Sequence, residues 1–263
     1  MSARRILVTR PAGAWPGLVQ HFAGSEIAIE IAPTTVQIEP ADPVPGDRAI
    51  RHLEGYTWLV VTSGQGVKAL TLRLAARDRQ GLPQGLRVAA IGPATARALE
   101  GTGVAVDLIA AESRSEGLAA ALRPKLRSSD RVLIVRPEGA PGLLAAALRA
   151  TGASVDEAPL YRTIAAGGAA ALAERAIRGA FAGVAFTAPS CLDLWLAASG
   201  PRAADLTATL SNLRRVAIGR TTAAHLGDRG LPAHAVADAP DEIAVGEAIA
   251  RALLTSGPFG GID

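Results

Sequence analysis

The chain lacks the residues that would mark a disulfide scaffold or a metalloprotein. Its 263 residues include one cysteine, Cys191, which excludes a disulfide framework and any Cys-x-x-Cys metal motif. The four histidines, His21, His52, His225 and His234, form no His-Glu-x-x-His or His-x-His motif. We therefore expect no metal site.

Long apolar runs are also missing. No run approaches the roughly 20 apolar residues that a membrane-spanning helix needs, so we expect no membrane partner. Near the N-terminus, the apolar stretch that follows Arg5 is far shorter than the about 7–15 residues at the centre of a secretion signal. These absences predict a cytoplasmic protein.

Aromatic residues and lysines are scarce. With 3% aromatics the chain has no stacking platform for single-stranded nucleic acid, and it contains no DNA-binding motif, so we expect no nucleic-acid partner. Lys68 and Lys125 are the only lysines, so 25 of the 27 basic residues are arginines. Arginine favours bidentate capture of carboxylates and phosphates, although GC-rich codon usage accounts for most of this excess.

Strand-like and helix-like segments alternate along the whole chain. Alanine-, leucine- and arginine-rich stretches with helical spacing separate short β-rich runs. Ser113-x-x-Glu116 predicts a capping box for the helix through 118–122. The alternation predicts an α/β fold with parallel sheets covered by helices. The predicted strands are 5–9, 27–31, 58–61, 87–91, 104–108, 131–135, 154–157, 183–186, 215–218 and 233–236.

The second half of the chain repeats the first. RPAGAWPGL from Arg10 corresponds to RPEGAPGL from Arg136, with one residue deleted. Farther on, Thr62 corresponds to Thr187, and AIGPATARAL corresponds to AIGRTTAAHL. The offset stays between 125 and 127 residues and the motifs keep their order, which indicates a duplication.

Two segments of the chain are predicted to cross between the domains, so that each domain is built from the end of one copy and the beginning of the other. Residues 33–45 and 159–168 each follow the second strand of a copy, so each is predicted to cross from one domain to the other. We therefore predict one domain made of residues 1–36 and 163–263 and a second made of residues 37–162.

Polar residues cluster after the predicted strands, where open parallel sheets bind ligands. Each loop offers small hydroxyl or glycine residues before a helix start, an arrangement that suits anions, although Ser and Thr before a helix are also ordinary N-caps. Four such loops with two arginines beside them favour an anion-binding cleft. The candidate binding residues are Arg10, Thr62, Ser63, Gly64, Thr95, Arg136, Thr187, Ser190, Thr221 and Thr222.

Other catalytic motifs are incomplete. Gly64-Gln65-Gly66 lacks the third glycine of a dinucleotide-binding fingerprint, and no P-loop is present. No histidine is placed by a motif to activate Ser190 or Cys191 as a nucleophile. Tyr161 lies in a crossing segment beside Arg162, where both a core and a functional role are open.

With these residues assembled, the chain resembles the uroporphyrinogen-III synthase family over essentially its whole length. The resemblance implies two flavodoxin-like α/β domains joined by a two-stranded connector, with the active site in the cleft between them. The motifs that carry it, in order, are ILVTRP, VVTSGQGVKAL, VAAIGPATARALEGTG, VLIVRPEGAPGLLAAAL, GASVDEAPLYRT, VAFTAPS and VAIGRTTAAHLGDRGLPAHAVA.

The resemblance implies a cyclising lyase of haem biosynthesis that acts without a cofactor. Such an enzyme removes water from hydroxymethylbilane, inverts the terminal pyrrole and closes the ring to uroporphyrinogen III. The family's catalytic tyrosine, proposed to assist departure of the hydroxyl, maps to Tyr161, and its substrate contacts map to Ser63, Thr95, Ser190 and Thr222. We further expect a monomer that makes transient contact with the preceding enzyme of the pathway.

Other functions stay open from the residues alone. A hinge-type receptor for small anions and a flavodoxin-like nucleotide or flavin module share the architecture. A cytosolic small-anion or tetrapyrrole-binding sensor descended from the synthase is a third alternative, and it would bind without turnover.

Overall fold

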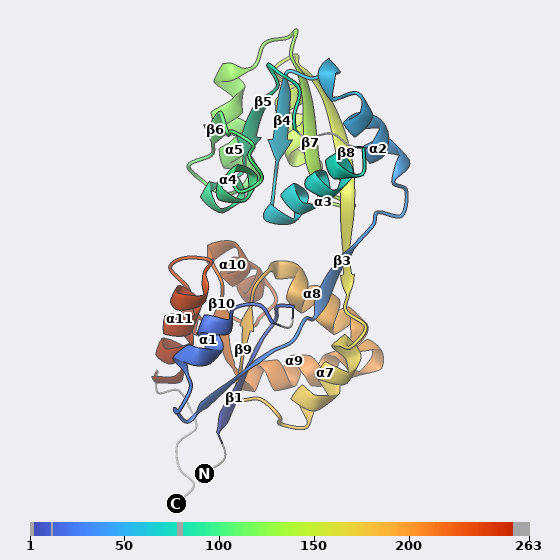
Figure 1. The fold of residues 1–263 in the computed structure, drawn as a ribbon. Helices are drawn as coiled ribbons and strands as arrows, with labels where there is room; N and C mark the ends of the chain where they lie inside the picture. Colours follow the sequence, from blue (N-terminus) through green and yellow to red (C-terminus); the bar gives the residue numbers. More distant parts are fainter. Residues whose placement is uncertain (1–2, 12, 78–80, 255–263) are drawn as a thin grey trace, which may run out of the picture. The chain divides into compact units, whose positions relative to one another are not determined.

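The structure, a computed structural model, describes residues 3–11, 13–77 and 81–254. Residues 1–2 and 255–263, which were assigned to the first predicted domain, lie outside the described residues. The chain forms two compact units (Figure 1), one with residues 1–36 and 164–263 and the other with residues 37–163. The predicted α/β class with parallel sheets is confirmed. Within the described ranges, no helix has both the length and the hydropathy to cross a membrane.

Unit 1, which contains the two chain ends, is built on a five-stranded parallel sheet with the order β11-β10-β9-β1-β2. Counted along the chain, this is the flavodoxin-like order 2-1-3-4-5, whose connections reverse direction between β1 and β9. Its strands are β1 (Arg4–Val8), β2 (Ile27–Ile31), β9 (Gly183–Phe186), β10 (Arg214–Ala217) and β11 (Ala235–Val236). Its helices are α1 (Pro16–His21), α7 (Ala169–Ile177), α8 (Pro189–Ala198), η3 (Gly200–Arg202), α9 (Ala203–Asn212), α10 (Arg220–Asp228) and α11 (Glu242–Leu254).

Unit 2, the middle of the chain, holds a six-stranded sheet with the order β3-β8-β7-β4-β5-β6, parallel from β8 to β6. From β8 onward the order is again flavodoxin-like, but the chain enters at the third strand, so the direction of the connections reverses between β7 and β4. Its strands are β3 (Thr35–Ile38), β4 (Trp58–Val61), β5 (Arg87–Ala90), β6 (Leu108–Ile109), β7 (Arg131–Pro137) and β8 (Ser154–Ala165). Its helices are α2 (Val44–Arg51), η1 (Leu53–Gly55), α3 (Gly64–Ala75), α4 (Pro93–Glu100), α5 (Ser115–Leu122), η2 (Arg123–Lys125) and α6 (Leu143–Arg149).

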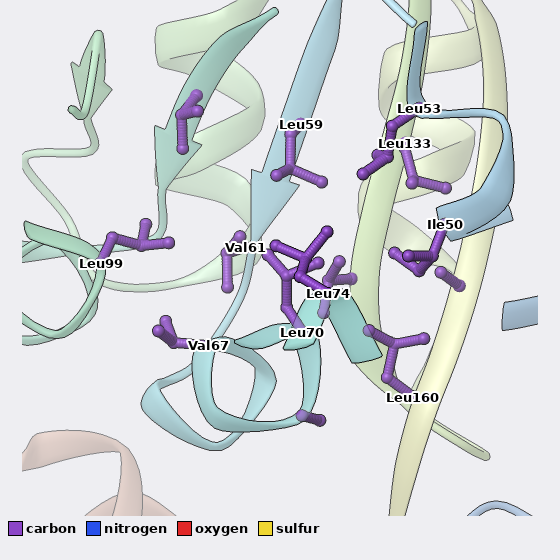
Figure 2. Close-up of a cluster of buried hydrophobic side chains, with 14 of the residues drawn as sticks. Ile50, Leu53, Leu59, Val61, Val67, Leu70, Leu74, Leu99, Leu133 and Leu160 are labelled. Carbon is purple, nitrogen blue, oxygen red and sulfur yellow. The ribbon is translucent and has the colours of Figure 1, made fainter. Parts of the chain in front are cut away.

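Helices cover both faces of the sheet in unit 2, because its central strands are apolar on both sides. Leu59 and Val61 of β4 pack with α2, α3 and α4, whereas Trp58 and Val60 pack with α5 and α6. Figure 2 shows the first of these clusters, in which Leu70 of α3 lies beside the β4 side chains. All four residues of β4 are apolar and buried, and they point alternately to the two faces of the sheet. This pattern suits an interior strand, and β4 lies between β7 and β5.

Unit 1 has the same layered core. Leu7 and Phe186 pack with α7, α8, α9 and α10 on one face, while Ile6, Val8 and Ala185 pack with α1 and α11 on the other.

The duplication is also visible in an ion pair that occurs in both copies. Arg5 of β1 lies 3.7 Å from Glu30 of β2, and Arg131 of β7 lies 3.3 Å from Asp156 of β8. Each pair joins the first and second strands of its copy, and both members are 126 residues apart from their counterparts.

Three local predictions need correction. The predicted capping box is wrong, because α5 begins at Ser115 after Arg114 and no side chain caps it; Ser113 packs against Gly92 instead. The strand predicted at 104–108 is two residues long and lies later, at Leu108–Ile109. The strand predicted at 154–157 continues to Ala165, because pairing with β3 and β7 extends it.

Candidate functional site

The predicted site residues belong to the two units separately. Most of each set lies at the carboxyl ends of the strands, in the loops or first helical turns that follow them, whereas Arg136 and Tyr161 lie within β7 and β8. Unit 1 contains Arg10, Thr187, Ser190, Thr221 and Thr222. Unit 2 contains Thr62, Ser63, Gly64, Thr95, Arg136 and Tyr161.

A β-bulge in β8 sets the direction of Tyr161. Arg136 of β7 pairs with Pro159, but Pro137 pairs with Tyr161, so Leu160 is an extra residue in the ladder. In a regular strand, neighbouring side chains point to opposite faces. Here Leu160 and Tyr161 both join the core on the α3 side of the sheet. The bulge therefore directs the tyrosine toward the start of α3, as bulges often do beside functional sites.

Ser63 and Tyr161 form the one side-chain hydrogen bond that joins two of the predicted residues of unit 2, among those that the structure describes. Their hydroxyl oxygens lie 2.8 Å apart, and either can be the donor. Ser63 is also the N-cap of α3, since its Oγ accepts from the backbone N–H of Gly66 at 2.9 Å. The capping hydrogen bond fixes the position of Ser63 Oγ, which is the hydrogen-bond partner of the Tyr161 hydroxyl.

Tyr161 is 8% exposed. Burial raises the pKa of Tyr161 above its ordinary value of about 10, and the hydrogen bond with Ser63 lowers it by less. The phenol is therefore neutral and carries its proton at physiological pH. It is available as a proton donor.

Tyr56 provides a matched tyrosine outside the predicted site. It is 9% exposed, and its hydroxyl donates to Asp156 Oδ2 at 2.8 Å. Burial first and the Asp156 hydrogen bond second raise the pKa of Tyr56 to about 12. It belongs to the same unit as Tyr161 and to the same core.

We expect Tyr56 to make unit 2 lose stability in alkaline solution. Because its pKa is about 12 in the folded chain and about 10 when unfolded, its contribution is complete below about pH 10 and is lost as the pH rises toward about 12. Tyr56→Phe removes this titrating hydroxyl. Between about pH 10 and about pH 12, the free energy of unfolding of the variant should therefore fall less than that of the wild type. Urea unfolding at several pH values measures both. Equal losses in the two proteins would contradict this assignment.

Thr62 and Thr187 occupy equivalent positions and use their hydroxyls in the same way. Thr62 Oγ1 donates to Val135 O at 3.0 Å, which joins the ends of β4 and β7. Thr187 Oγ1 donates to Thr9 O at 2.7 Å, which joins the ends of β9 and β1. Each hydroxyl thus links the two strands between which the connections reverse direction, β4 and β7 for Thr62 and β9 and β1 for Thr187. Both hydroxyl protons are therefore donated to backbone carbonyls.

The remaining predicted hydroxyl residues lie in the first turns of α4, α8 and α10, three helices whose N-cap residues make no side-chain hydrogen bond. Gly92 precedes α4, Ala188 precedes α8 and Gly219 precedes α10, and none of these three helices has a side-chain hydrogen bond at its N-cap. The first-turn backbone N–H groups of these helices are therefore without a side-chain acceptor, a condition that favours anions. Thr95 and Thr222 are buried, Ser190 is half-buried, and Thr221 and Gly64 are exposed.

The two arginines singled out by the repeat have different surroundings. Arg136 of β7 forms an ion pair with Glu157 of the adjacent strand β8. The guanidinium of Arg10 instead lies over the ring of Trp15, 4.0 Å from its centroid, and its buried Nε has no hydrogen-bond partner. Burial lowers the pKa of both arginines.

Sequence reasoning missed Trp15, Glu157 and the bulge at Leu160. The deleted residue between RPAGAWPGL and RPEGAPGL is the tryptophan, so the repeat itself contained a signal for Trp15. Arg162, beside Tyr161, also has a buried Nε without a partner.

A pocket of about 360 Å³ in unit 2 lies at the other end of α3 from Ser63. Its arginines are already paired, Arg73 with Glu39 and Asp47, and Arg77 with Asp47. Among the described residues that line this pocket, no arginine is left to hold an anion. In the described part of the chain, no three His, Cys, Asp or Glu residues gather as a metal site would require.

Comparisons with known proteins agree with one another. A family model described as uroporphyrinogen-III synthase HemD matches residues 27–246. A curated uroporphyrinogen-III synthase from Synechococcus elongatus is 29% identical over 135 residues, which are 51% of this chain and 51% of that relative, so the match spans about half of the relative's length.

Two solved structures show the same fold at low identity. A mutant uroporphyrinogen III synthase from Thermus thermophilus has a TM-score of 0.72 and 23% identity, covering 97% of this chain and 100% of that one. The uroporphyrinogen-III synthetase from Helicobacter pylori has a TM-score of 0.60 and 19% identity, covering 95% and 99%.

Proposed function

The chain belongs to the uroporphyrinogen-III synthase family, and on this basis we propose that it cyclises hydroxymethylbilane to uroporphyrinogen III in haem biosynthesis. The reaction removes one molecule of water and inverts the terminal pyrrole before the ring closes. The observation that carries the proposal in the structure is the hydrogen bond between half-buried Ser63, after β4, and buried Tyr161 of β8.

Tyr161 is proposed as the catalytic residue. Its neutral phenol donates a proton to the departing hydroxyl while the carbon–oxygen bond breaks, so that water leaves and the electron-rich pyrrole carries the positive charge. The cationic carbon bonds to the substituted α-carbon of the terminal pyrrole, and the bond from that α-carbon to its linking carbon then breaks. The freed linking carbon bonds to the unsubstituted α-carbon of the same pyrrole, which loses a proton and so restores the phenol. Ser63 holds the phenol oxygen in place through the 2.8 Å hydrogen bond.

The other predicted residues are proposed to bind the eight carboxylates of the linear tetrapyrrole. Gly64, Thr95, Ser190, Thr221 and Thr222 lie in the first turns of α3, α4, α8 and α10, whose backbone N–H groups suit anions. Thr62 and Thr187 hold the strand ends together beneath these turns.

Arg10 and Arg136 are proposed to supply the side-chain cations. Arg10 has no acid partner among the described residues, whereas Arg136 has to share its charge with Glu157. The substrate's carboxylates would then meet one arginine in each unit.

We further propose that β3 and β8 form a two-stranded connector. The chain passes from unit 1 to unit 2 within β3 and returns within β8, and the two strands are neighbours in the sheet of unit 2. The main task of the protein would then be to fold the substrate so that inverted closure is faster than direct closure, which is catalysis by orientation.

The remaining proposals concern the setting of the reaction. No cofactor is required, because the pyrroles provide the electrons for bond formation. The protein is proposed to be a cytoplasmic monomer that receives its unstable substrate by transient contact with the preceding enzyme.

The proposal is tested by supplying fresh hydroxymethylbilane and following its consumption with and without the protein. We expect consumption to accelerate with the protein concentration. Binding of the substrate without faster consumption would instead identify a tetrapyrrole-binding sensor.

A further inference from the structure

Four arginines stack on aromatic rings in the described part of the chain, and one of them differs from the others. Arg87 over Trp58, Arg131 over Tyr56 and Arg175 over Phe181 each also form an ion pair with a carboxylate. Arg10 over Trp15 has no such partner among the described residues.

The comparison with Arg87 shows what is missing at Arg10. Both guanidiniums lie about equally far from an indole centroid, 4.0 Å for Arg10 and 4.2 Å for Arg87. Arg87 donates to Asp130 at 3.1 Å, whereas the buried Nε of Arg10 has no acceptor. A partly buried cation without a partner is costly, so the position is suited to an anion that arrives from outside the chain.

Stacking leaves Arg10 able to bind such an anion. An aromatic ring contacts the face of a guanidinium, while the N–H donors point outward from its edge. The stack therefore uses none of the donors that can form two parallel hydrogen bonds to one carboxylate. Trp15 therefore holds the Arg10 guanidinium in place without occupying the N–H donors of the guanidinium.

Trp15 adopts a backbone conformation that bulky residues avoid. Its φ of 57° makes it the one non-glycine residue with positive φ among those described. Pro16 follows it, and a residue before proline favours extended backbone. Such conformations persist only where the surroundings enforce them, and they gather at functional sites.

The duplicated copy shows the alternative arrangement. Trp15 is the residue that the second copy lacks between RPEGA and PGL. In that copy Arg136 is tied to Glu157, and the position equivalent to Glu157 in the first copy is Ile31. One copy thus has the tryptophan and no acid, and the other has the acid and no tryptophan.

We propose that Trp15 is a positioning residue that holds the edge of Arg10 toward a substrate carboxylate. The proposal rests on the proposed function and adds a specific role for one carboxylate of the linear tetrapyrrole. Trp15 itself makes no bond to the reacting atoms. Its effect is on substrate binding and passes through Arg10.

The test is a double-mutant cycle on KM and kcat for hydroxymethylbilane. We expect Trp15→Leu to raise KM by about tenfold and to change kcat less than about twofold, because one bidentate contact is lost. Trp15→Phe keeps an aromatic face and should stay within about threefold of the wild-type KM. In the Arg10→Gln background, Trp15→Leu should add nothing. Arg87→Lys, in the stacked pair that already has an acid, is the matched control and should leave both constants unchanged.

Two results would overturn the proposal. One is that Trp15→Leu raises KM by the same factor whether position 10 holds arginine or glutamine. The other is an unchanged KM in Arg10→Gln, which decides the question even if Trp15→Leu does not fold. Failure of the proposed function is seen separately, in the wild type alone, if it forms only the type I isomer; the role of Trp15 then falls with it.

Discussion

Tyr161→Phe is expected to lower kcat for uroporphyrinogen III formation by about 100-fold while the protein stays folded. A positioned proton donor typically contributes 10²–10⁴-fold, and this phenol is buried and neutral. As the enzymatic route slows, spontaneous closure competes, so the share of the type I isomer should rise. The measurement is the initial rate and the isomer ratio with fresh hydroxymethylbilane.

Tyr56→Phe is the control for this prediction. It removes a hydroxyl of similar burial that is bonded to Asp156, in the same unit. We expect turnover within about twofold of the wild type, because loss of one such hydrogen bond costs about 1 kcal/mol of stability. Equal activity of Tyr161→Phe and the wild type would remove Tyr161 from the mechanism.

Trp195→Ala is expected to lower the free energy of unfolding of unit 1 by about 3–5 kcal/mol. The side chain is fully buried at the centre of α8, beside Phe186, and its Nε1 donates to Ala169 O at 3.0 Å. The substitution leaves a cavity and removes this hydrogen bond. For a chain of this size the melting temperature should fall by roughly 10 °C, measured by calorimetry.

Ile243→Ala serves as the control in the same unit. Ile243 is 69% exposed on α11, so its truncation should change stability by less than about 0.5 kcal/mol. A melting temperature in Trp195→Ala that matches this control would contradict the packing of α8 described here.

The fold class followed from the sequence because its signals are local and repeated. Strands such as β2, β4 and β9 have the predicted bounds, since each is a short apolar run between helix signals. The end of β8 was not predicted as a strand, because Pro159 and the following residues owe their strand conformation to pairing with β3 and β7. Pairing between distant segments has no local signature.

The candidate site also combines features that the local sequence predicts with features that depend on distant strands. Loop hydroxyls such as Ser63 could be placed by position, since they follow recognisable strands. The direction of Tyr161 depends on an extra residue in a ladder, which the sequence does not reveal. The repeat made Arg10 and Arg136 look equivalent, but the acid that separates them, Glu157, lies on a neighbouring strand.

The most direct test of the proposed function is the identity of the product isomer. Fresh hydroxymethylbilane is incubated with the wild-type chain, and the cyclic products are separated chromatographically beside a sample without protein. We expect the type III isomer to dominate with the protein and the type I isomer without it. Formation of the type I isomer alone in both samples would contradict the proposal that this chain is a uroporphyrinogen-III synthase.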